Sequence, residues 1–424
     1  MLTTLRNAWN IPELRKKLIF TLFVLLLYRI GNAVPVPFVD TAALAAYFNA
    51  TLADTVLGLY NAMSGSAFSQ ASVLALAIQP YINASIIIQL LTIAIPALEQ
   101  LSKEGGEEGK KKISVITRYT TVGLGLLMGF AYYTMLSNYG LLTTTGFLPG
   151  LVIVLSFTAG STLVMWLGEQ ITEFGIGNGI SMILFANIIS RIPSDVSDAI
   201  TGITSGSMAW WAAILLLIGI LALVVFIVFM TNSERRIPVQ YAKRVVGRKM
   251  YGGQSTHLPI KVNMSGVLPV IFAQSIASLP ATICAFTGST SGWWYEYVFS
   301  NSSAVYAVCY FLLIIAFSYF YAAVQYNPIE IANNLKKNGG FIPGFRPGKP
   351  TADFIGRTIN KIVVFGAMFL AVVALMPIIV GNLISISSLA IGGTSVIIVV
   401  GVALETVNTL EAQLMMRHYK GFLD

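Results

Sequence analysis

The sequence predicts an all-α polytopic membrane protein with ten transmembrane helices in two inverted five-helix halves and one short re-entrant helix. The chain of 424 residues is 56% hydrophobic and 10% charged, and its mean hydropathy is +0.76. Soluble domains carry about 25% charged residues, so this composition argues strongly against a water-soluble protein. Ten apolar stretches are each long enough to cross the roughly 30 Å of hydrocarbon in a bilayer.

Basic residues gather in five segments that alternate with pairs of these apolar stretches. Only Arg29 and Arg191 lie outside the five segments. The other 24 of the 26 lysines and arginines lie in residues 6–17, 103–118, 235–261, 336–361 and 417–420. Cytoplasmic loops of membrane proteins are enriched in these residue types. The pattern therefore predicts an even number of crossings, with both termini on the cytoplasmic side.

The first half of the chain follows an amphipathic cytoplasmic segment, residues 1–17, and covers residues 18–200. A basic segment precedes the first apolar stretch, but no small-residue cleavage site follows it, which favours a membrane helix over a signal peptide. The predicted spans of this half are 18–38, 71–97, 114–136, 148–168 and 179–196.

Residues 55–69 are apolar enough to enter the membrane and too short to cross it. A stretch of this length is typical of a re-entrant or interfacial segment, and Gly58 and Gly65 weaken a regular helix within it. Irregular backbone at membrane depth persists only inside protein or beside water. The segment therefore predicts an internal cavity open to the outer side, with an ordinary outer loop in the headgroups as the alternative.

The second half covers residues 201–410 and ends in a cytoplasmic tail, residues 411–424. Because five is an odd number, a second five-span unit enters the membrane in the opposite orientation, which allows an inverted repeat. The predicted spans of this half are 208–231, 265–286, 304–326, 359–381 and 387–408.

Two long cytoplasmic loops interrupt the second half. Residues 232–264 carry seven basic residues and a single acid, Glu234. Residues 327–358 contain four prolines and five glycines, a density that indicates a defined loop path. Protruding basic loops of this kind suit docking on an acidic cytoplasmic partner.

No catalytic residue, metal ligand or cofactor is predicted. The sequence has neither a His-Glu-x-x-His nor a Gly-x-Ser-x-Gly motif, and its two histidines, His257 and His418, fall in cytoplasmic segments. Ionisable residues are nearly absent from the spans. Ion-coupled transporters and intramembrane enzymes usually keep such residues near the midplane, so their scarcity argues against both classes. An inverted-repeat secondary transporter for a small solute remains the alternative, because that architecture is also built from such repeats.

Six stretches of the chain resemble the SecY/Sec61 α family of protein-conducting channels, over roughly residues 5–420. These stretches are Pro80–Leu91, Gly168–Ser181, Tyr241–Arg244, Gln254–Asn263, Asn327–Lys337 and Phe341–Thr351. The resemblance implies a channel subunit, not an enzyme, that moves unfolded preproteins across the bacterial plasma membrane. It also implies that transmembrane segments leave the channel sideways into lipid through a lateral gate.

The family's pore is closed by a ring of aliphatic side chains and a short plug helix on the outer side. The resemblance places the ring at Ile82, Ile86, Leu184, Ile271 and Ile398. It places the plug within residues 55–69, with its centre at Leu59, Tyr60, Asn61, Ala62, Met63, Ser64 and Gly65. Hydrophobic constrictions gate by dewetting, so a ring of this composition is suited to a seal.

The resemblance also implies a lateral gate and cytoplasmic partners. The gate lies between the second and third helices on one side and the seventh and eighth on the other. Its facing residues are expected to include Ile87, Gln89, Thr92, Asn263 and Leu279. Docking to the ribosome and to the SecA motor ATPase is expected at Lys243, Arg244, Arg248, Lys249 and Arg346. SecE and SecG are the expected partner subunits, and signal sequences and unfolded preproteins the expected substrates.

Overall fold

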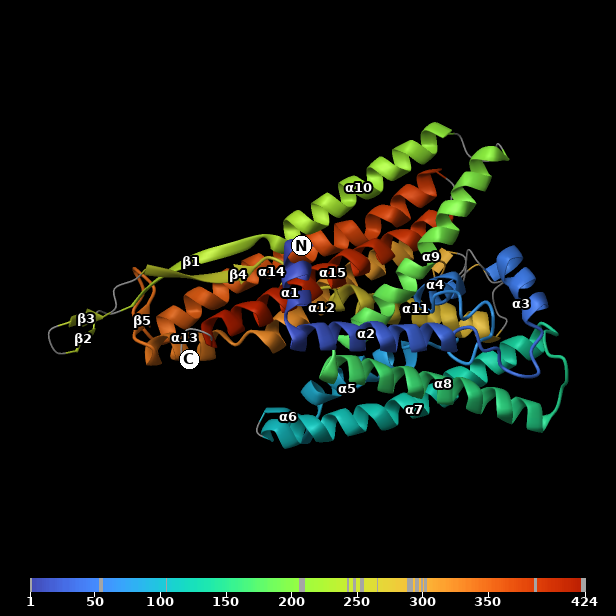
Figure 1. The fold of residues 1–424 in the computed structure, drawn as a ribbon, viewed down its shortest axis with the longest axis horizontal. Coiled ribbons are helices and arrows are strands. Elements are labelled where there is room, and N and C mark those ends of the chain that lie inside the picture. The colour runs from blue at the N-terminus through green and yellow to red at the C-terminus, as the bar shows by residue number, and fades with distance from the viewer. Residues whose placement is uncertain are drawn as a thin grey trace.

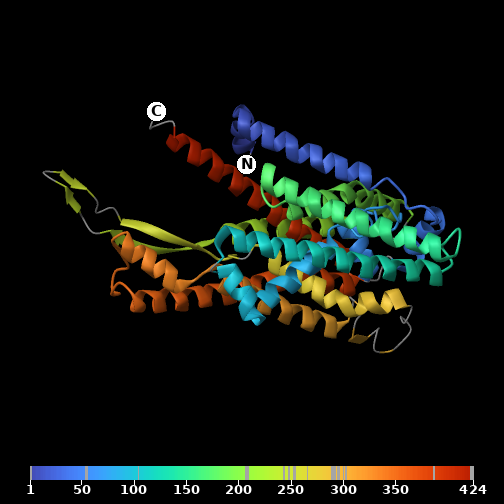
Figure 2. The ribbon, with the colours of Figure 1, turned by 90° about the horizontal axis from the view of Figure 1, so that it is seen from below.

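The computed structural model of the chain is mostly helical. It describes residues 2–52, 56–103, 105–205, 210–241, 244–246, 249–251, 255–264, 266–287, 293, 297–298, 300, 303–384 and 387–420. A bundle of long helices makes up most of the molecule, and an arm of β-strands extends from one end of it (Figures 1 and 2). Both chain ends lie toward the end of the bundle that carries the arm.

The first half holds ten helical segments. They are α1 (Leu2–Asn10), α2 (Pro12–Gly31), α3 (Thr41–Tyr47), the π-helix η1 (Phe48–Leu52), α4 (Val56–Met63), α5 (Gln79–Ala94), α6 (Pro96–Lys103), α7 (Gly106–Asn138), α8 (Phe147–Phe174) and α9 (Gly179–Thr204). Helix α9 continues past residue 200, so the predicted boundary between the halves falls inside a helix.

The second half holds six helices and all five strands of the described part. The helices are α10 (Trp210–Asn232), α11 (Leu268–Thr287), α12 (Ala304–Gln325), α13 (Pro328–Lys337), α14 (Lys349–Ile384) and α15 (Ser387–Lys420). The strands are β1 (Glu234–Tyr241), β2 (Arg244–Val246), β3 (Lys249–Tyr251), β4 (Ser255–Lys261) and β5 (Gly340–Phe341).

Six helical segments of the described residues are long and apolar enough to cross a membrane, and a seventh is obtained if α5 and α6 count as one bent span. The six are Gly106–Asn138, Phe147–Phe174, Ala213–Asn232, Ala304–Lys337, Lys349–Met376 and Ser395–Met415. The apolar parts of α9 and α11 are shorter, and α2 carries four basic residues and one acid. Each of the ten predicted spans overlaps a helix, but ten crossings remain a prediction.

The predicted second span, residues 71–97, is wrong in its first eight residues. Helix α5 begins only at Gln79, and residues 64–78 form a series of turns. Backbone hydrogen bonds hold these turns against residues 34–36, with Val73 donating to Val34 and Val36 donating to Ala71. At the other end, Pro96 follows a break at which α6 turns from α5 by 105°, as expected where proline ends a helix.

The all-α prediction is also incomplete, because the loop 232–264 folds into an arm of strands. β1 pairs antiparallel with β4 in the register Glu234↔Lys261 to Gln240↔Ser255, and β5 pairs with the end of β1. The sequence of β1 places Ile237 and Val239 two residues apart, and both are buried. Side chains two residues apart lie on one face of a strand, so this alternation fits a strand with one buried face.

The loop 327–358 is more regular than its proline and glycine content predicted. Pro328 occupies the first turn of α13, and the side chain of Asn327 accepts a hydrogen bond from the backbone N–H of Ile329. These are common start signals of a helix. Helix α14 begins at Lys349, ten residues before the predicted span. A buried apolar cluster that includes Ile237 and Ile355 packs the arm against α13 and α14.

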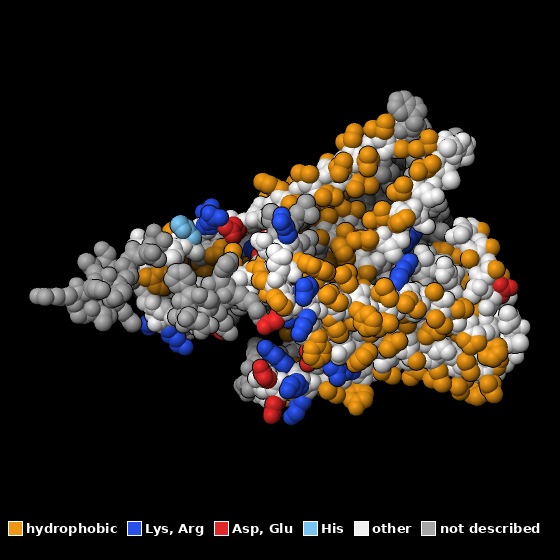
Figure 3. Space-filling view, viewed as in Figure 1, with side chains coloured by type: hydrophobic (Ala, Val, Ile, Leu, Met, Phe, Trp, Pro, Cys, Tyr) orange, Lys and Arg blue, Asp and Glu red, His pale blue; other side chains and the backbone are white. Residues whose placement is uncertain are grey.

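The face of the bundle seen in Figure 3 is largely apolar, and most charged side chains on it gather near the arm. Large hydrophobic side chains such as Leu22, Leu221 and Phe365 are more than half exposed. A soluble protein rarely leaves so extended an apolar surface in contact with water. The distribution is that of a helical bundle with lipid around its sides.

Candidate functional site

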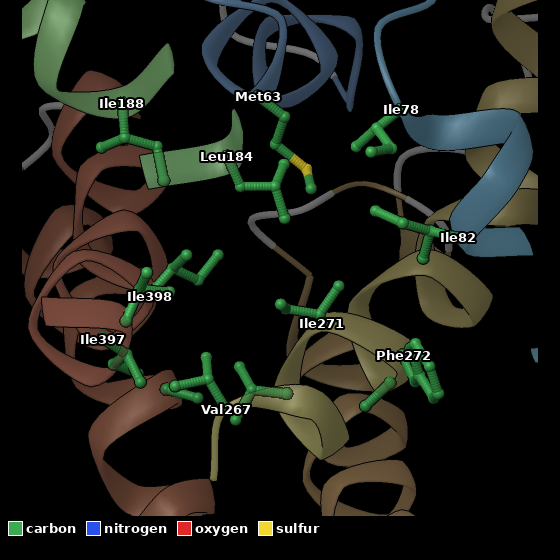
Figure 4. Packing of buried hydrophobic residues seen from close by; sticks show 14 of the residues in the cluster. Met63, Ile78, Ile82, Leu184, Ile188, Val267, Ile271, Phe272, Ile397 and Ile398 are labelled. Carbon is green, nitrogen blue, oxygen red and sulfur yellow. The ribbon is translucent and has the colours of Figure 1, made fainter. Parts of the chain in front are cut away.

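Aliphatic side chains from four different helices meet at the centre of the bundle. Ile82 and Ile86 project from α5, Leu184 from α9, Ile271 from α11 and Ile398 from α15. All five belong to one buried cluster, and none is more than 3% exposed. Figure 4 shows Ile82, Leu184, Ile271 and Ile398 projecting from these helices into the same space. The structure thus brings together every residue that the resemblance placed in the ring.

Local helix geometry explains why these side chains converge. Ile82 and Ile86 are four residues apart, and side chains at this spacing share one face of a helix. Leu184 lies in the second turn of α9, and Ile271 lies in the first turn of α11. Segments from both halves of the chain therefore contribute to the same apolar centre.

Four neighbours of this centre were missed from the sequence. They are Ile78, Ile188, Val267 and Ile397, and all belong to the same buried cluster (Figure 4). Aliphatic residues are also the normal lipid-facing residues of membrane helices, so residue type alone did not distinguish these four positions.

Helix α4 lies on one side of the apolar centre, inside the bundle. Met63, its last residue, points toward Ile78 and Leu184 in Figure 4. The helix contacts α9, α11 and α15, and Tyr60, Asn61 and Ala62 are buried. The predicted segment 55–69 is helical only as far as Met63, and Ser64 and Gly65 lie in the turn that follows. Residue 55 and the side chain of Leu59 lie outside the described part.

In the described part of the chain, one direct polar contact joins the expected gate residues to the facing helices. The hydroxyl of Tyr321 on α12 donates a hydrogen bond of 2.7 Å to Oε1 of Gln89 on α5. Gln89 also donates to the hydroxyl of Ser85 on its own helix. Tyr321 was not predicted as a gate residue. A tyrosine at the end of the aromatic run Tyr319–Tyr321 gives no sequence signal of the partner that its hydroxyl contacts.

The other expected gate residues do not join this contact. The hydroxyl of Thr92 donates to the carbonyl of Ile88 within α5. Asn263 is buried, and its Oδ1 atom has no hydrogen-bond partner among the described residues. Ile87 and Leu279 are each 40% exposed. Among the residues that the structure describes, Gln89–Tyr321 is thus the direct polar contact that these expected gate residues make with the facing helices.

The expected docking residues lie at the arm end of the molecule. Lys243 and Arg248 fall outside the described residues. Arg244 lies in β2 and Lys249 in β3, the antiparallel pair that Figure 1 places at the far end of the arm. Arg346 is exposed in the turn between β5 and α14, and its backbone carbonyl accepts a hydrogen bond of 2.8 Å from Thr351.

Comparison with known proteins identifies the family. The sequence profile of SecY matches residues 72–407 of this chain. The chain belongs to the SecY family. The protein translocase subunits SecY of Streptomyces scabiei and Bacillus licheniformis are each 43% identical to it, and each match covers 100% of both chains. The family resemblance is therefore confirmed.

Solved structures of the same fold agree with this assignment. A protein-conducting channel is similar with a TM-score of 0.66 at 19% identity, over 94% of this chain and 92% of the other. Sec61 in a canine ribosome–channel complex is similar with a TM-score of 0.62 at 17% identity, over 94% and 92% of the two chains. The SecY relatives and the apolar helices together make this SecY-family chain a multi-pass membrane protein.

Proposed function

We propose that this chain is the channel subunit of a protein translocase. It passes unfolded preproteins through the centre of the bundle and releases transmembrane segments sideways into lipid. The observation that carries the proposal is the closed aliphatic centre formed by α5, α9, α11 and α15, with α4 beside it. A solute transporter would instead need polar or charged ligands near the midplane, and the ring positions here are all aliphatic.

The ring residues Ile82, Ile86, Leu184, Ile271 and Ile398 close the pore in this proposal. Branched side chains without hydrogen-bonding groups can separate around an extended polypeptide without selecting its sequence, and a narrow apolar passage excludes water and ions by dewetting. A seal matters because each charge that crosses the membrane dissipates about 2.3 kcal/mol per 100 mV. Helix α4 acts as the plug that fills the outer side of the ring at rest.

The lateral gate lies between α5 and α7 on one side and α11 and α12 on the other. The contact between Gln89 and Tyr321 keeps the gate closed until an apolar signal sequence intercalates. Release into lipid is then driven by transfer of apolar surface out of water. Ile87 and Leu279 are the apolar positions that the passing segment contacts.

The orientation follows from the distribution of basic residues. Ten helices cross the bacterial plasma membrane in two inverted halves, and both termini and the arm face the cytoplasm. The basic arm docks on phosphate-rich ribosomal RNA, which requires charge but no base reading. Arg346 couples the channel to the SecA motor. SecE holds the two halves together, and SecG is a peripheral third subunit.

Reconstitution tests this function. The chain, purified with the subunits that accompany it in mild detergent, is expected to translocate a preprotein into liposomes when SecA and ATP are added. Removal of residues 57–66, which include most of α4, is expected to produce ion currents in a planar bilayer. A silent bilayer after this deletion would contradict a plugged channel.

A further inference from the structure

The turn at the end of α4 leaves three carbonyls that its own backbone N–H groups do not bond. Gly65 has a φ of +66°, a left-handed conformation that favours glycine. Its N–H bonds to the carbonyl of Ala62, and the N–H of Ser66 bonds to the carbonyl of Asn61. This is the Schellman arrangement of a helix C-terminus. It leaves the carbonyls of Met63, Ser64 and Gly65 without these backbone partners.

Each of these three carbonyls accepts a hydrogen bond from a side chain on another helix or just beyond one. Asn187 of α9 donates to Met63 at 2.7 Å, and Asn32, next to the end of α2, donates to Ser64 at 3.2 Å. Arg29 of α2 donates through Nη1 to Gly65 at 3.0 Å. The guanidinium also supplies positive charge at the negative end of the α4 dipole, which is a stabilising position for a cation.

The geometry around Gly65 shows how closely this end of α4 is held. A Cβ atom at residue 65 would lie 2.8 Å from Arg29 Nη1, 3.0 Å from Asn187 Oδ1 and 3.2 Å from Ser190 Oγ. Asn187 is fully buried, and its amide also donates to the hydroxyl of Tyr28 at 2.9 Å. Two helices therefore enclose the same turn from two sides.

Two of these contacts, those of Arg29 and Asn32, are also placed where water can replace them. Arg29 is an exposed residue, and a cavity of about 240 Å³ is lined by Asn32, Ser72 and the exposed Gln70. The Oδ1 atom of Asn32 and the hydroxyl of Ser72 have no protein partner among the described residues. A polar cavity of this size has room for several waters. Departure of α4 therefore leaves Arg29 and Asn32 able to bond with solvent.

We infer that Arg29, Asn32 and Asn187 form a polar latch that holds α4 in the closed position. This inference rests on the proposed role of α4 as a plug. The apolar ring seals the pore, whereas the latch determines how often α4 leaves its closed position. The three residues are positioning residues: they contact α4, and the passing polypeptide does not need to touch them.

The latch can be tested by the accessibility of α4. Ala62, which is 5% exposed, is replaced by cysteine in a variant whose native Cys284 and Cys309 are changed to alanine. The full complex is placed in nanodiscs and treated with a bulky, charged maleimide. Arg29→Met is expected to raise the labelling rate of residue 62 about tenfold, the size of effect that loss of a hydrogen bond to a charged group produces.

Two further variants separate positioning from general damage. Arg29→Lys keeps the charge and is expected to restore most of the protection, while Asn187→Leu is expected to raise labelling as Arg29→Met does. Arg357→Met, the same exchange at an exposed position of α14, should leave labelling unchanged. The variants with faster labelling of residue 62 should also show the larger ion leak in planar bilayers.

The outcomes distinguish the latch from the channel itself. Unchanged labelling in both Arg29→Met and Asn187→Leu, with ion currents from the deletion of residues 57–66, would overturn the latch and leave the channel intact. Increased leak without increased labelling would also overturn the latch, because α4 would still be in place. Absence of currents from the deletion would remove the plug role and the latch with it.

Discussion

In the proposed channel, branched aliphatic side chains at the centre of the bundle keep water and ions out of the closed pore. Replacing Ile82 and Ile86 by glycine removes two of the five ring side chains from a single helix. The passage widens and loses apolar surface, so water can enter it. We expect the resting ion conductance of the variant, measured in planar bilayers, to rise at least severalfold above that of the unmodified channel.

A matched control separates this effect from the cost of glycine in a helix, roughly 1 kcal/mol relative to alanine. Ile93 lies on the same helix and is 53% exposed. Ile93→Gly carries the same helix penalty without opening the centre, and it should conduct no more than the original protein. Equal leak from both sites would remove Ile82 and Ile86 from the ring.

In the proposed gate, the hydrogen bond between Gln89 and Tyr321 affects how strictly the channel discriminates among signal sequences. Tyr321→Phe keeps the aromatic side chain at residue 321 and removes the hydroxyl that donates this hydrogen bond. A neutral hydrogen bond contributes about 0.5–1.5 kcal/mol, so the open gate should become roughly 2–10 times more populated. We expect this variant to translocate a preprotein with a weakened signal sequence faster than the original channel does.

The control for this exchange lies two residues away. Tyr319 is on the same helix and is 38% exposed, and Tyr319→Phe should leave the selectivity for signal sequences unchanged. If the weakened signal sequence is handled equally by Tyr321→Phe and the original channel, the bond does not restrain the gate.

At the scale of elements, the turn between β5 and α14 presents one exposed arginine on an ordered support. The rings of Phe345 and Phe354 pack 4.3 Å apart between centroids, and Thr351 bonds to the carbonyl of Arg346. The backbone is therefore held by these contacts, and the guanidinium is exposed. Arg346→Glu should preserve the fold while reversing the charge offered to SecA.

The expected result is a loss of SecA-driven secretion that is larger than any loss of membrane-protein insertion. Both are measured in the same vesicles, with secretion assayed by protease protection of a preprotein. Arg357→Glu serves as the control, because Arg357 is also an exposed arginine and lies on α14, the helix that follows the turn. Equal loss of secretion and insertion at Arg346 would argue against a motor-specific role.

The long spans could be predicted from the sequence because hydrophobicity and basic charge alone define them. The irregular elements could not. Residues 71–78 are apolar and were predicted to begin a membrane helix, but their turns are held by backbone bonds to residues 34–36, which are distant in sequence. The strands of the arm required pairing between β1 and β4, again a non-local contact.

The candidate site shows the same division between local and distant information. Ile82 and Ile86 share a face by helix spacing, which the sequence states directly. Tyr321 and Gln89 lie on different helices and are separated by 232 positions, so their hydrogen bond depends on the tertiary arrangement and not on local sequence. The contacts of Arg29 with the end of α4 likewise depend on the position of a short helix that propensity does not define.

At the scale of the whole molecule, the described residues form four buried apolar clusters. The central cluster joins both halves, a second lies around α3, η1 and the ends of α7 and α8, a third fixes the arm to α13 and α14, and a small fourth joins α1, α2 and α15. In the proposed channel, opening of the gate breaks the hydrogen bond between α5 and α12. We expect this opening to be a relative displacement of packed helices and not a local melting.

A reversible crosslink across the gate tests this displacement. Cysteines replace Gln89 and Tyr321 in a variant without Cys284 and Cys309, and a short bis-thiosulfonate joins them through disulfides. If the halves must separate for function, the crosslinked channel should neither translocate a preprotein nor release a transmembrane segment, and a thiol reductant should restore both activities. Each single cysteine, treated with the same reagent, should remain active because it cannot bridge the helices. Full translocation by the crosslinked channel would show that the polypeptide passes without separation of α5 and α12, since the tether leaves these helices no room to part.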